Sequence, residues 1–431
     1  MGSTQSLEAV ISILKDKKSS GQPIVAAVSA MSKVTDTLLE QAKEAKMKQF
    51  DTEMFEMLKT RHLETLSQLA PSNDPTELKE LLAQLQDALT NAIFINEIPD
   101  LAYIDYIASF GERLSAQLLA SALIATNENV KFVDARDFIQ SDDNFTNATI
   151  DYNISQAQAR EYFKTHKADI YIVTGFIART QSGQTTTLGR GGSDFTGGLL
   201  ANFLEAKEVE IWTDVDGILS TDPRLVPDAQ IIDTLSYREA FEVAYYGGKV
   251  LYPKTMEACQ PKNVDIVIKN TFNPSASGSR VTTNTQPGIK VVSRVKKAVV
   301  VEVVFAAITS EYGLLGKIFS WFGELKVTID VVTTSGDSVS FTCDKEPSQS
   351  LINKIKEEIG EITVWTDKEI IAVIGSDISE TDQYSPIIDL IKASKPIMLS
   401  LNTKQTNLTA IVEAHQGEQL VRDIHRVIVG G

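Results

Sequence analysis

The stretch "ADIYIVTGFIARTQSGQTTTLGRGGSDFTGGLLANFLEAKEVEIWTD", residues 168–214, decides the fold class. It opens on an apolar run that predicts a buried strand, and a glycine loop then leads into a helical pattern over 197–206. A second apolar run follows over 208–214. Strands and helices that alternate at this interval are typical of a parallel sheet with crossover helices. We therefore expect an α/β protein.

The segments before this stretch agree with that class. Residues 22–31, "QPIVAAVSAM", and 130–135, "VKFVDA", predict further interior strands, because short Val/Ile/Ala runs bounded by turn residues fit a parallel sheet. Residues 36–125 instead show helical spacing, broken near Pro71, Pro75 and Pro99. We expect a helical insertion there.

A change of composition at 273–288, "NPSASGSRVTTNTQPG", marks the expected end of the first domain. Beyond it, two rounds of strand and helix patterns predict two βαββαβ-like units with a repeat of roughly 65 residues. Ferredoxin-like modules have this order of elements. Such modules usually bind or regulate rather than catalyse.

Composition excludes several classes of function. A formal charge of −16 argues against a nucleic-acid partner and against an anionic membrane surface, and charges interrupt every apolar run before the roughly 20 residues of a bilayer span. Two cysteines cannot form a disulfide framework, so a cytoplasmic setting is expected. Four histidines without ligand spacing make zinc improbable, and Mg²⁺ held by carboxylates and phosphate is the favoured metal. No residue is assigned as a metal ligand.

The loop "TLGRGGSDFTGG", residues 187–198, packs five glycines around Arg190 and Asp194. Its place between a strand and a helix suits an anion, although a plain tight turn would have the same glycines. The spacing matches neither the dinucleotide fingerprint nor the P-loop pattern. Arg190 offers a fork for a carboxylate and Asp194 a charge for an ammonium group. Together they suit an amino acid.

A second polar segment follows the strand at 208–214. Asp214 and Asp216 fall at the carboxyl end of that strand, where open α/β sheets bind ligands. A solvated acidic turn is the alternative for this stretch alone. Arg224 and Lys249 add cations that favour a nucleotide site.

These motifs, in this order, closely resemble those of aspartate kinase, which has the amino-acid kinase fold. The stretches that carry the resemblance cover nearly the whole chain: "VSAMSKVTDTLL", "SFGERLSAQLLA", "TTTLGRGGSDFTGGLLA", "EIWTDVDGILSTDPRLVPDA", "LSYREAFEVAYYGGKVLYPKTM" and "VIKNTFNPSASGS". The GRGGSD loop is the most specific of them. The tail is similar to the paired ACT modules of the family.

The resemblance implies ATP-dependent phosphorylation of the β-carboxylate of L-aspartate, with Mg²⁺ bridging phosphate oxygens. This is the entry step to lysine, threonine and methionine synthesis. Arg190 and Asp194 are then the catalytic residues. The implied substrate-binding residues are Ser29, Thr35, Glu112, Phe176, Arg190, Gly191, Gly192 and Ser193, and the implied nucleotide-binding residues are Thr213, Asp214, Leu219, Arg224, Lys249 and Val250.

The chain departs from the family pattern at two places. Leu219 stands where many relatives have tyrosine. Relatives also begin with a strand that carries Lys-Phe-Gly-Gly-Thr-Ser, whereas Gly2 and Ser3 here match the residues just after it. We expect the strand, with its catalytic lysine, to precede Met1 in the gene. An inactive regulatory subunit that binds amino acids is the alternative.

The implied domains are a kinase domain over 1–290, a first ACT module over 297–365 and a second over 366–431. Eight residues of the first module match effector positions of lysine-inhibited relatives: Ile308, Glu311, Leu314, Leu315, Thr328, Asp330, Ser335 and Gly336. Glu311 replaces a serine there. Lysine is the expected effector, because no homoserine dehydrogenase domain follows. ACT modules pair across subunits, so a homodimer or homotetramer is expected.

Overall fold

A computed structural model describes residues 2–19, 21–47, 50–92, 100–248, 250–305 and 313–430. The chain divides into two compact units. Unit 1 comprises 1–216 and 250–283, and unit 2 comprises 217–249 and 284–431. The predicted bounds at 290, 297 and 366 stay predictions.

Unit 1 combines a helical block with three groups of paired strands, one of them entirely parallel. Its helices are α1 (Thr4–Lys18), α2 (Val34–Lys46), α3 (Thr52–Leu69), α4 (Thr76–Thr90), α5 (Asp100–Ala108), α6 (Phe110–Ile124), α7 (Tyr152–Thr165), α8 (Gly192–Phe203) and α10 (Pro253–Cys259). Its strands are β1 (Ile24–Val28), β2 (Val130–Val133), β3 (Gln140–Ser141), β4 (Ile170–Thr174), β5 (Ile177–Thr180), β6 (Thr185–Thr187), β7 (Glu208–Thr213), β9 (Asp265–Asn270) and β10 (Ser279–Thr282).

The expected parallel sheet is present around β4. All five residues of β4 are buried, and β1 and β2 pair with it in parallel on its two sides. β7 pairs in parallel with β9. Helix α8 packs on both β1 and β7, and each of these strands has one edge that is unpaired within the described part of the chain.

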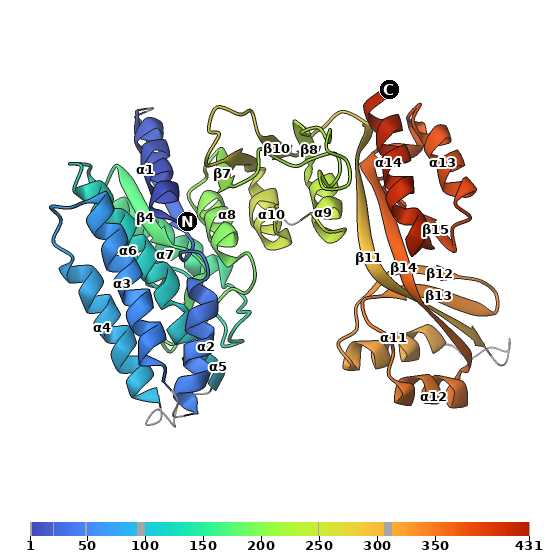
Figure 1. The fold of residues 1–431 in the computed structure, drawn as a ribbon, viewed down its shortest axis with the longest axis horizontal. Coiled ribbons are helices and arrows are strands. Elements are labelled where there is room, and N and C mark those ends of the chain that lie inside the picture. The colour runs from blue at the N-terminus through green and yellow to red at the C-terminus, as the bar shows by residue number, and fades with distance from the viewer. Residues whose placement is uncertain are drawn as a thin grey trace. The chain divides into compact units, whose positions relative to one another are not determined.

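The predicted helical insertion is the block α2 to α6. α4 buries Leu78, Leu82, Leu85 and Leu89, a leucine stripe at helical spacing that faces its neighbours. α3, α4 and α6 pack on one another (Figure 1). The block therefore has its own apolar core, which continues into the sheet at Ile170.

Unit 2 is built on one antiparallel sheet in the order β12-β13-β11-β14-β16-β15. Its elements are β8 (Thr234–Ser236), α9 (Tyr237–Tyr245), β11 (Gly288–Phe305), α11 (Leu314–Glu324), β12 (Ile329–Thr334), β13 (Ser338–Cys343), α12 (Gln349–Glu358), β14 (Gly360–Ser376), α13 (Tyr384–Ala393), β15 (Met398–Leu401), β16 (Asn407–Glu413) and α14 (Ala414–Gly430).

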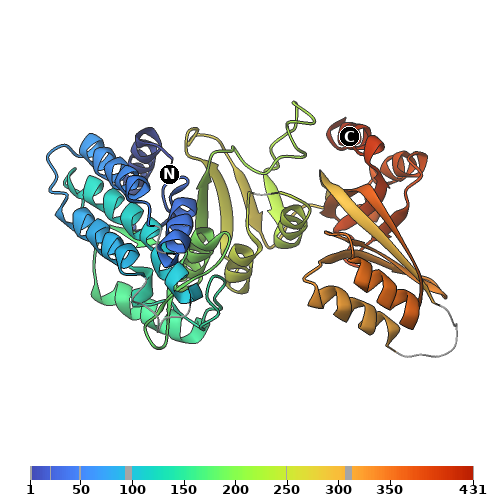
Figure 2. The same ribbon diagram turned by 60° about the horizontal axis from the view of Figure 1, so that its bottom comes forward.

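Two strands of 18 and 17 residues, β11 and β14, pair with each other. β14 crosses the predicted boundary between the two modules, whereas β11 begins before the predicted start of the first module. Their pairing shifts register between Val295 and Val300, and Lys297 and Asp367 adopt positive φ there. One apolar core lies on each side of this break. α11 and α12 lie along one end of the long strands and α13 and α14 along the other (Figure 1; Figure 2). The second core also includes residues from the start of β11, such as Ile289.

Helix α9 is anchored to this sheet by Glu239, which is fully buried. Glu239 closes a capping box with Ser236 at the start of the helix. Its carboxylate also accepts hydrogen bonds from Lys290 Nζ on β11, at 2.9 Å, and from Ser376 Oγ on β14, at 2.9 Å. The segment before the long strands is thus tied to both of them.

The cysteines and the helices bear on two expectations drawn from composition, concerning disulfides and membrane spans. Cys259 and Cys343 are both buried and free. No helix in the described part of the chain has the length and apolar character that crossing a membrane requires.

Candidate active site

The glycine loop forms a tight connection between β6 and α8 in unit 1. Gly191, the N-cap of α8, has φ of 73°, and a Cβ there would lie 2.3 Å from Tyr252 Cγ. Only glycine combines this backbone conformation with so close a neighbour. The Gly191 carbonyl accepts the N–H of Phe195 at 2.9 Å, which starts the helix. The glycines therefore let the loop pack against α10 and its flanking residues.

A cavity of about 480 Å³ opens beside this loop. Every residue for which the sequence implied a substrate-side role lines it: Ser29, Thr35, Glu112, Phe176, Arg190, Gly191, Gly192, Ser193 and Asp194. These residues come from four separate stretches of sequence, so the fold brings together what the sequence keeps apart. Their individual roles stay predictions.

Arg190 is the exposed cation of the cavity. It forms no hydrogen bond or ion pair with any other residue in the described ranges. A guanidinium that is unengaged and beside a cavity can take a carboxylate in bidentate fashion. Arg190 is therefore available for an anionic ligand.

Glu112 supplies a buried carboxyl group at the start of α6. Its side chain is 3% exposed, and its Oε1 accepts the N–H of Ala30 at 3.1 Å. Its Oε2 has no hydrogen-bond partner in the described part of the chain. Burial raises the pKa of Glu112 to about 8, because removal from water disfavours the charged form. A cationic ligand group would reverse that penalty.

Asp194 and Phe176 complete the polar and apolar walls. Burial raises the pKa of Asp194, in the first turn of α8, to about 6. Phe176 has φ of 67°, a conformation that bulky residues rarely adopt, and its N–H donates to Thr196 Oγ1 at 3.0 Å. Strain of this kind concentrates at functional sites.

Sequence reasoning missed several residues of the cavity, among them Asp105, Thr146, Thr187 and Tyr252. Asp105 and Glu112 are seven residues apart but lie on different helices, α5 and α6, so their spacing gave no signal of a shared site. Tyr252 lies in the quoted "YYGGKVLYPKT" segment, but nothing in that segment marked it as a contact of the glycine loop.

The implied nucleotide-side residues divide between the two units. Thr213, Asp214 and Val250 belong to unit 1, with Thr213 at the end of β7. Leu219 and Arg224 belong to unit 2, where Arg224 NH2 pairs with Asp222 at 2.6 Å. Lys249 lies outside the described residues. The resemblance to aspartate kinase grouped these positions, and their nucleotide roles stay predictions.

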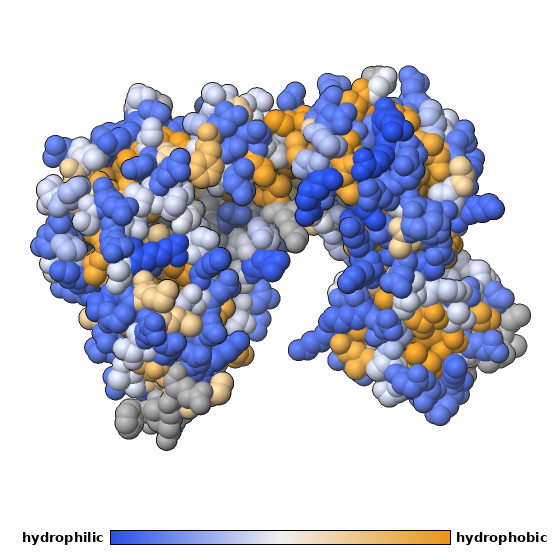
Figure 3. All heavy atoms as spheres, viewed as in Figure 1, coloured by the Kyte–Doolittle hydropathy of each residue, from blue (hydrophilic) through white to orange (hydrophobic). Residues whose placement is uncertain are grey.

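The implied effector residues lie around α11 and β12. Leu314 and Leu315 begin α11, Thr328 precedes β12, and Ser335 and Gly336 form the turn after it. Apolar side chains gather on the surface in the region of α11 and α12 (Figure 3).

Asp330, in β12, accepts a hydrogen bond from the Tyr245 hydroxyl of α9. Ile308 and Glu311 lie outside the described residues. The effector roles of all these positions stay predictions.

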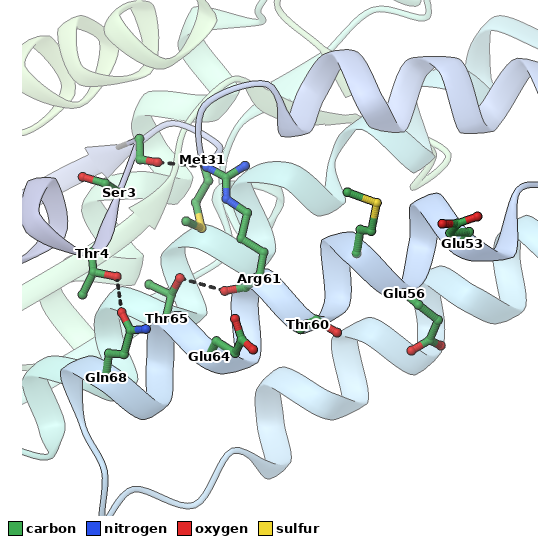
Figure 4. A pocket seen from close by; sticks show the side chains of 12 residues that line it. Ser3, Thr4, Met31, Glu53, Glu56, Thr60, Arg61, Glu64, Thr65 and Gln68 are labelled. Atoms are coloured by element: carbon green, nitrogen blue, oxygen red, sulfur yellow. Dashed lines mark hydrogen bonds between the residues drawn. The ribbon is translucent and has the colours of Figure 1, made fainter.

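A second, more open hollow lies between α1 and α3, lined by residues that include Arg61 and Gln68 (Figure 4). Arg61 donates to the carbonyls of Gly2 and Ser32, both at 2.9 Å, and Thr4 donates to Gln68 at 2.6 Å. The polar groups that line this hollow therefore join α1 and the residues before it to α3. Within the described ranges no cluster of three or more His, Cys, Asp or Glu side chains could hold a metal.

Unit 1 has an α/β fold in which a glycine loop begins a helix beside one cation and two carboxyl groups, an arrangement suited to a small charged metabolite. Residues 1–270 match the Amino acid kinase family. The chain therefore belongs to the amino acid kinase family, as the sequence motifs predicted.

The similar curated proteins include aspartokinases. The chain is 30% identical over 429 residues to aspartokinase 1, chloroplastic, of Arabidopsis thaliana, and the match covers 93% of this chain and 74% of that protein. Aspartokinase 3, chloroplastic, of the same plant is 30% identical over 426 residues, which cover 94% of this chain and 76% of that protein. The predicted resemblance to aspartate kinase is confirmed.

Solved structures agree on the fold. E. coli aspartokinase III with lysine and aspartate in the T-state has a TM-score of 0.77 at 26% identity, covering 94% of this chain and 92% of that one. The same enzyme with aspartate and ADP in the R-state has a TM-score of 0.82 at 24% identity, covering 99% and 97%. The predicted amino-acid kinase fold followed by ferredoxin-like modules is confirmed.

Proposed function

We propose that this chain transfers the γ-phosphoryl group of ATP to the β-carboxylate of L-aspartate. The products are ADP and 4-phospho-L-aspartate, as in the first step of lysine, threonine and methionine synthesis. The observation that carries the proposal is the cavity beside the glycine loop, which presents one unengaged guanidinium and two carboxyl groups of raised pKa. This charge pattern complements an amino acid.

Arg190 would hold the α-carboxylate through its two parallel N–H donors. Glu112 and Asp194 would face the ammonium group, whose charge favours their ionised forms and offsets the cost of burying them. Ser29, Thr35, Phe176 and Ser193 complete the wall. The β-carboxylate is then the free end of the substrate, and one of its oxygens attacks the γ-phosphorus as ADP leaves.

The nucleotide side follows from the family. The residues proposed to bind the nucleotide, from their match to family positions, are Thr213, Asp214, Leu219, Arg224, Lys249 and Val250. Mg²⁺ would be held largely by the phosphate oxygens of ATP and would supply neutralisation of their charge; no residue of the chain is assigned as its ligand. Catalysis of this type depends on positioning and on charge neutralisation.

Regulation by an amino acid is part of the proposal. The matched E. coli structure contains lysine, which supports lysine as the effector. We propose that it binds at the eight positions of the first ACT module. A homodimer or homotetramer through the ACT modules and a cytoplasmic location stay predictions, and the curated relatives are chloroplastic. The regulatory-subunit alternative is less favoured, because aspartokinases match over 93% of the chain.

The test is ATP turnover with L-aspartate, run alongside calorimetric binding of aspartate. Because β1 and β7 each have an unpaired edge within the described ranges, the assay includes a version with an added N-terminal Lys-Phe-Gly-Gly-Thr-Ser strand. Turnover in either version supports the proposal. Binding of aspartate without turnover in both would favour the regulatory alternative, and absence of both would refute the site.

Arg190→Ala should reduce aspartate affinity by about a hundredfold or more, the range for losing one partner of a charge pair. Arg190→Lys retains the charge but loses the fork, so it should recover only part of the affinity. Arg160→Ala, an arginine of α7 that pairs with Glu205, is the control and should bind as the wild type does. Unchanged binding in Arg190→Ala would remove Arg190 from the site.

A further inference from the structure

The carboxylate of Asp105 is the most heavily engaged acceptor at the cavity wall. Asp105 lies in α5 and is 1% exposed. Its Oδ1 accepts the Thr187 hydroxyl at 2.7 Å, and its Oδ2 accepts the backbone N–H groups of Thr187 and Thr146, both at 2.8 Å. A buried carboxylate is tolerated when it is hydrogen-bonded in this way. Its acceptor oxygens are therefore used for the protein itself.

The two segments that Asp105 joins also contact each other. Thr187 is the last residue of β6, two positions before Gly189, and its carbonyl accepts the N–H of Ala148 at 2.9 Å. Thr146 has φ of 70°, a conformation that costs a β-branched residue energy and persists only where its surroundings enforce it. The bond from Thr146 to Asp105 is one such constraint.

Lys254, in α10, bonds both the segment that contains Thr146 and the start of the glycine loop. Lys254 Nζ donates to Asn147 Oδ1 at 2.6 Å and to the Leu188 carbonyl at 2.9 Å. A Cβ on Gly189 would lie 2.7 Å from the same Asn147 oxygen, so turn and loop are in direct contact. The backbone at 187–189, directly before Arg190, is thus bonded from two directions.

We propose that Asp105 is a positioning residue that fixes the glycine loop, and through it Arg190, in the geometry that receives the substrate carboxylate. This inference rests on the proposed function for the identity of the substrate. Asp105 lines the cavity, but both of its carboxylate oxygens already accept bonds from the protein. Its effect on aspartate passes through Thr187 and the two residues that follow.

Thr187→Val tests the bond with a nearly isosteric change that removes only the hydroxyl donor to Asp105. Thr186→Val is the matched control, because Thr186 is also buried on β6 but its hydroxyl bonds Ser141 Oγ at 2.6 Å. Asp105→Asn is the stronger change, since its amide nitrogen cannot accept the N–H groups. If it fails to fold, the threonine pair still decides.

The first readout is hydrogen exchange of the amides at 187–191 without ligand, and the second is aspartate affinity. We expect Thr187→Val to raise exchange and lower affinity by about tenfold, the usual range for one bond to a charged group. Asp105→Asn should exceed this, with ATP affinity unchanged. Thr186→Val should leave both readouts within about twofold.

Equal exchange at 187–191 in Thr187→Val and Thr186→Val would overturn the positioning role, whatever the ligand. Faster exchange with unchanged aspartate affinity would also overturn it. Failure of the wild-type chain to bind aspartate refutes the proposed function instead, and the exchange comparison still decides whether Asp105 fixes the loop.

Discussion

Replacing Glu112 by glutamine should stabilise the ligand-free protein at alkaline pH and abolish most of its affinity for aspartate. The buried carboxyl group has one bonded and one unpartnered oxygen within the described part of the chain. Glutamine has nearly the same shape, retains an oxygen that can accept the Ala30 N–H, and never ionises. The variant therefore mimics the protonated side chain.

The magnitude follows from the pKa of this group in the two states. The carboxyl titrates at about 8 in the folded protein and near 4.5 when unfolded. Between these values the folded state holds the extra proton, so the free energy of unfolding falls as the pH rises and the full cost is present above about pH 8. The difference corresponds to roughly 5 kcal/mol at most. Glutamine removes that cost.

The assay is urea unfolding between about pH 5 and pH 9, followed by the shift of Tm with aspartate. Glu112→Gln should match the wild type at the acidic end and exceed it by several kcal/mol at the alkaline end. The control is Glu40→Gln, an exposed position on α2. A variant no more stable than the wild type at pH 9 would refute the burial argument, and an undiminished Tm shift with aspartate would refute the binding role.

Three further predictions concern separate parts of the chain. Gly191→Ala should lower aspartate affinity by at least about tenfold in calorimetry, because the added Cβ would meet Tyr252. Gly183→Ala is the control: Gly183 has φ of 88° but open space around it, so this variant should bind aspartate normally. Aspartate affinity should rise as the pH increases through about 6, because the pKa of Asp194 is raised to about 6 and its ionised form attracts the ammonium group of the substrate. Asp194→Asn should flatten that part of the plot of affinity against pH. Glu239→Gln should lower the free energy of unfolding by about 3 kcal/mol in urea, since it removes the buried negative charge that pairs with the partly buried Lys290. No loss of stability would show that the pair is dispensable.

The sheet and the glycine loop of unit 1 could be predicted from local sequence. The strand at 170–174 is a run of apolar residues, and the residues after it carry the loop signal directly. The long strands of unit 2 could not be predicted in full, because 288–297 is interrupted by charges and follows a turn-rich stretch. Only pairing with β14 shows that it is strand.

The cavity was predictable where residues carry a motif and was not where they act through long-range bonds. Arg190 and Asp194 stand in one short pattern that suits an amino acid. Asp105 is a single carboxylate in a helical pattern, for which solvation is the ordinary expectation, and its partner Thr187 lies 82 residues away. Such pairs are set by tertiary packing and leave no local periodicity.

The division into units has a consequence for cutting the chain. The chain enters unit 2 at 217, returns to unit 1 at 250 and leaves again at 284, so the two units are interleaved rather than consecutive. A fragment that ends at 283 would retain α9 but lose Lys290 and Ser376, leaving the buried carboxylate of Glu239 without these two donors. The C-terminal half is therefore not a detachable appendage, and an unregulated form of this protein is better sought through point substitutions than through truncation.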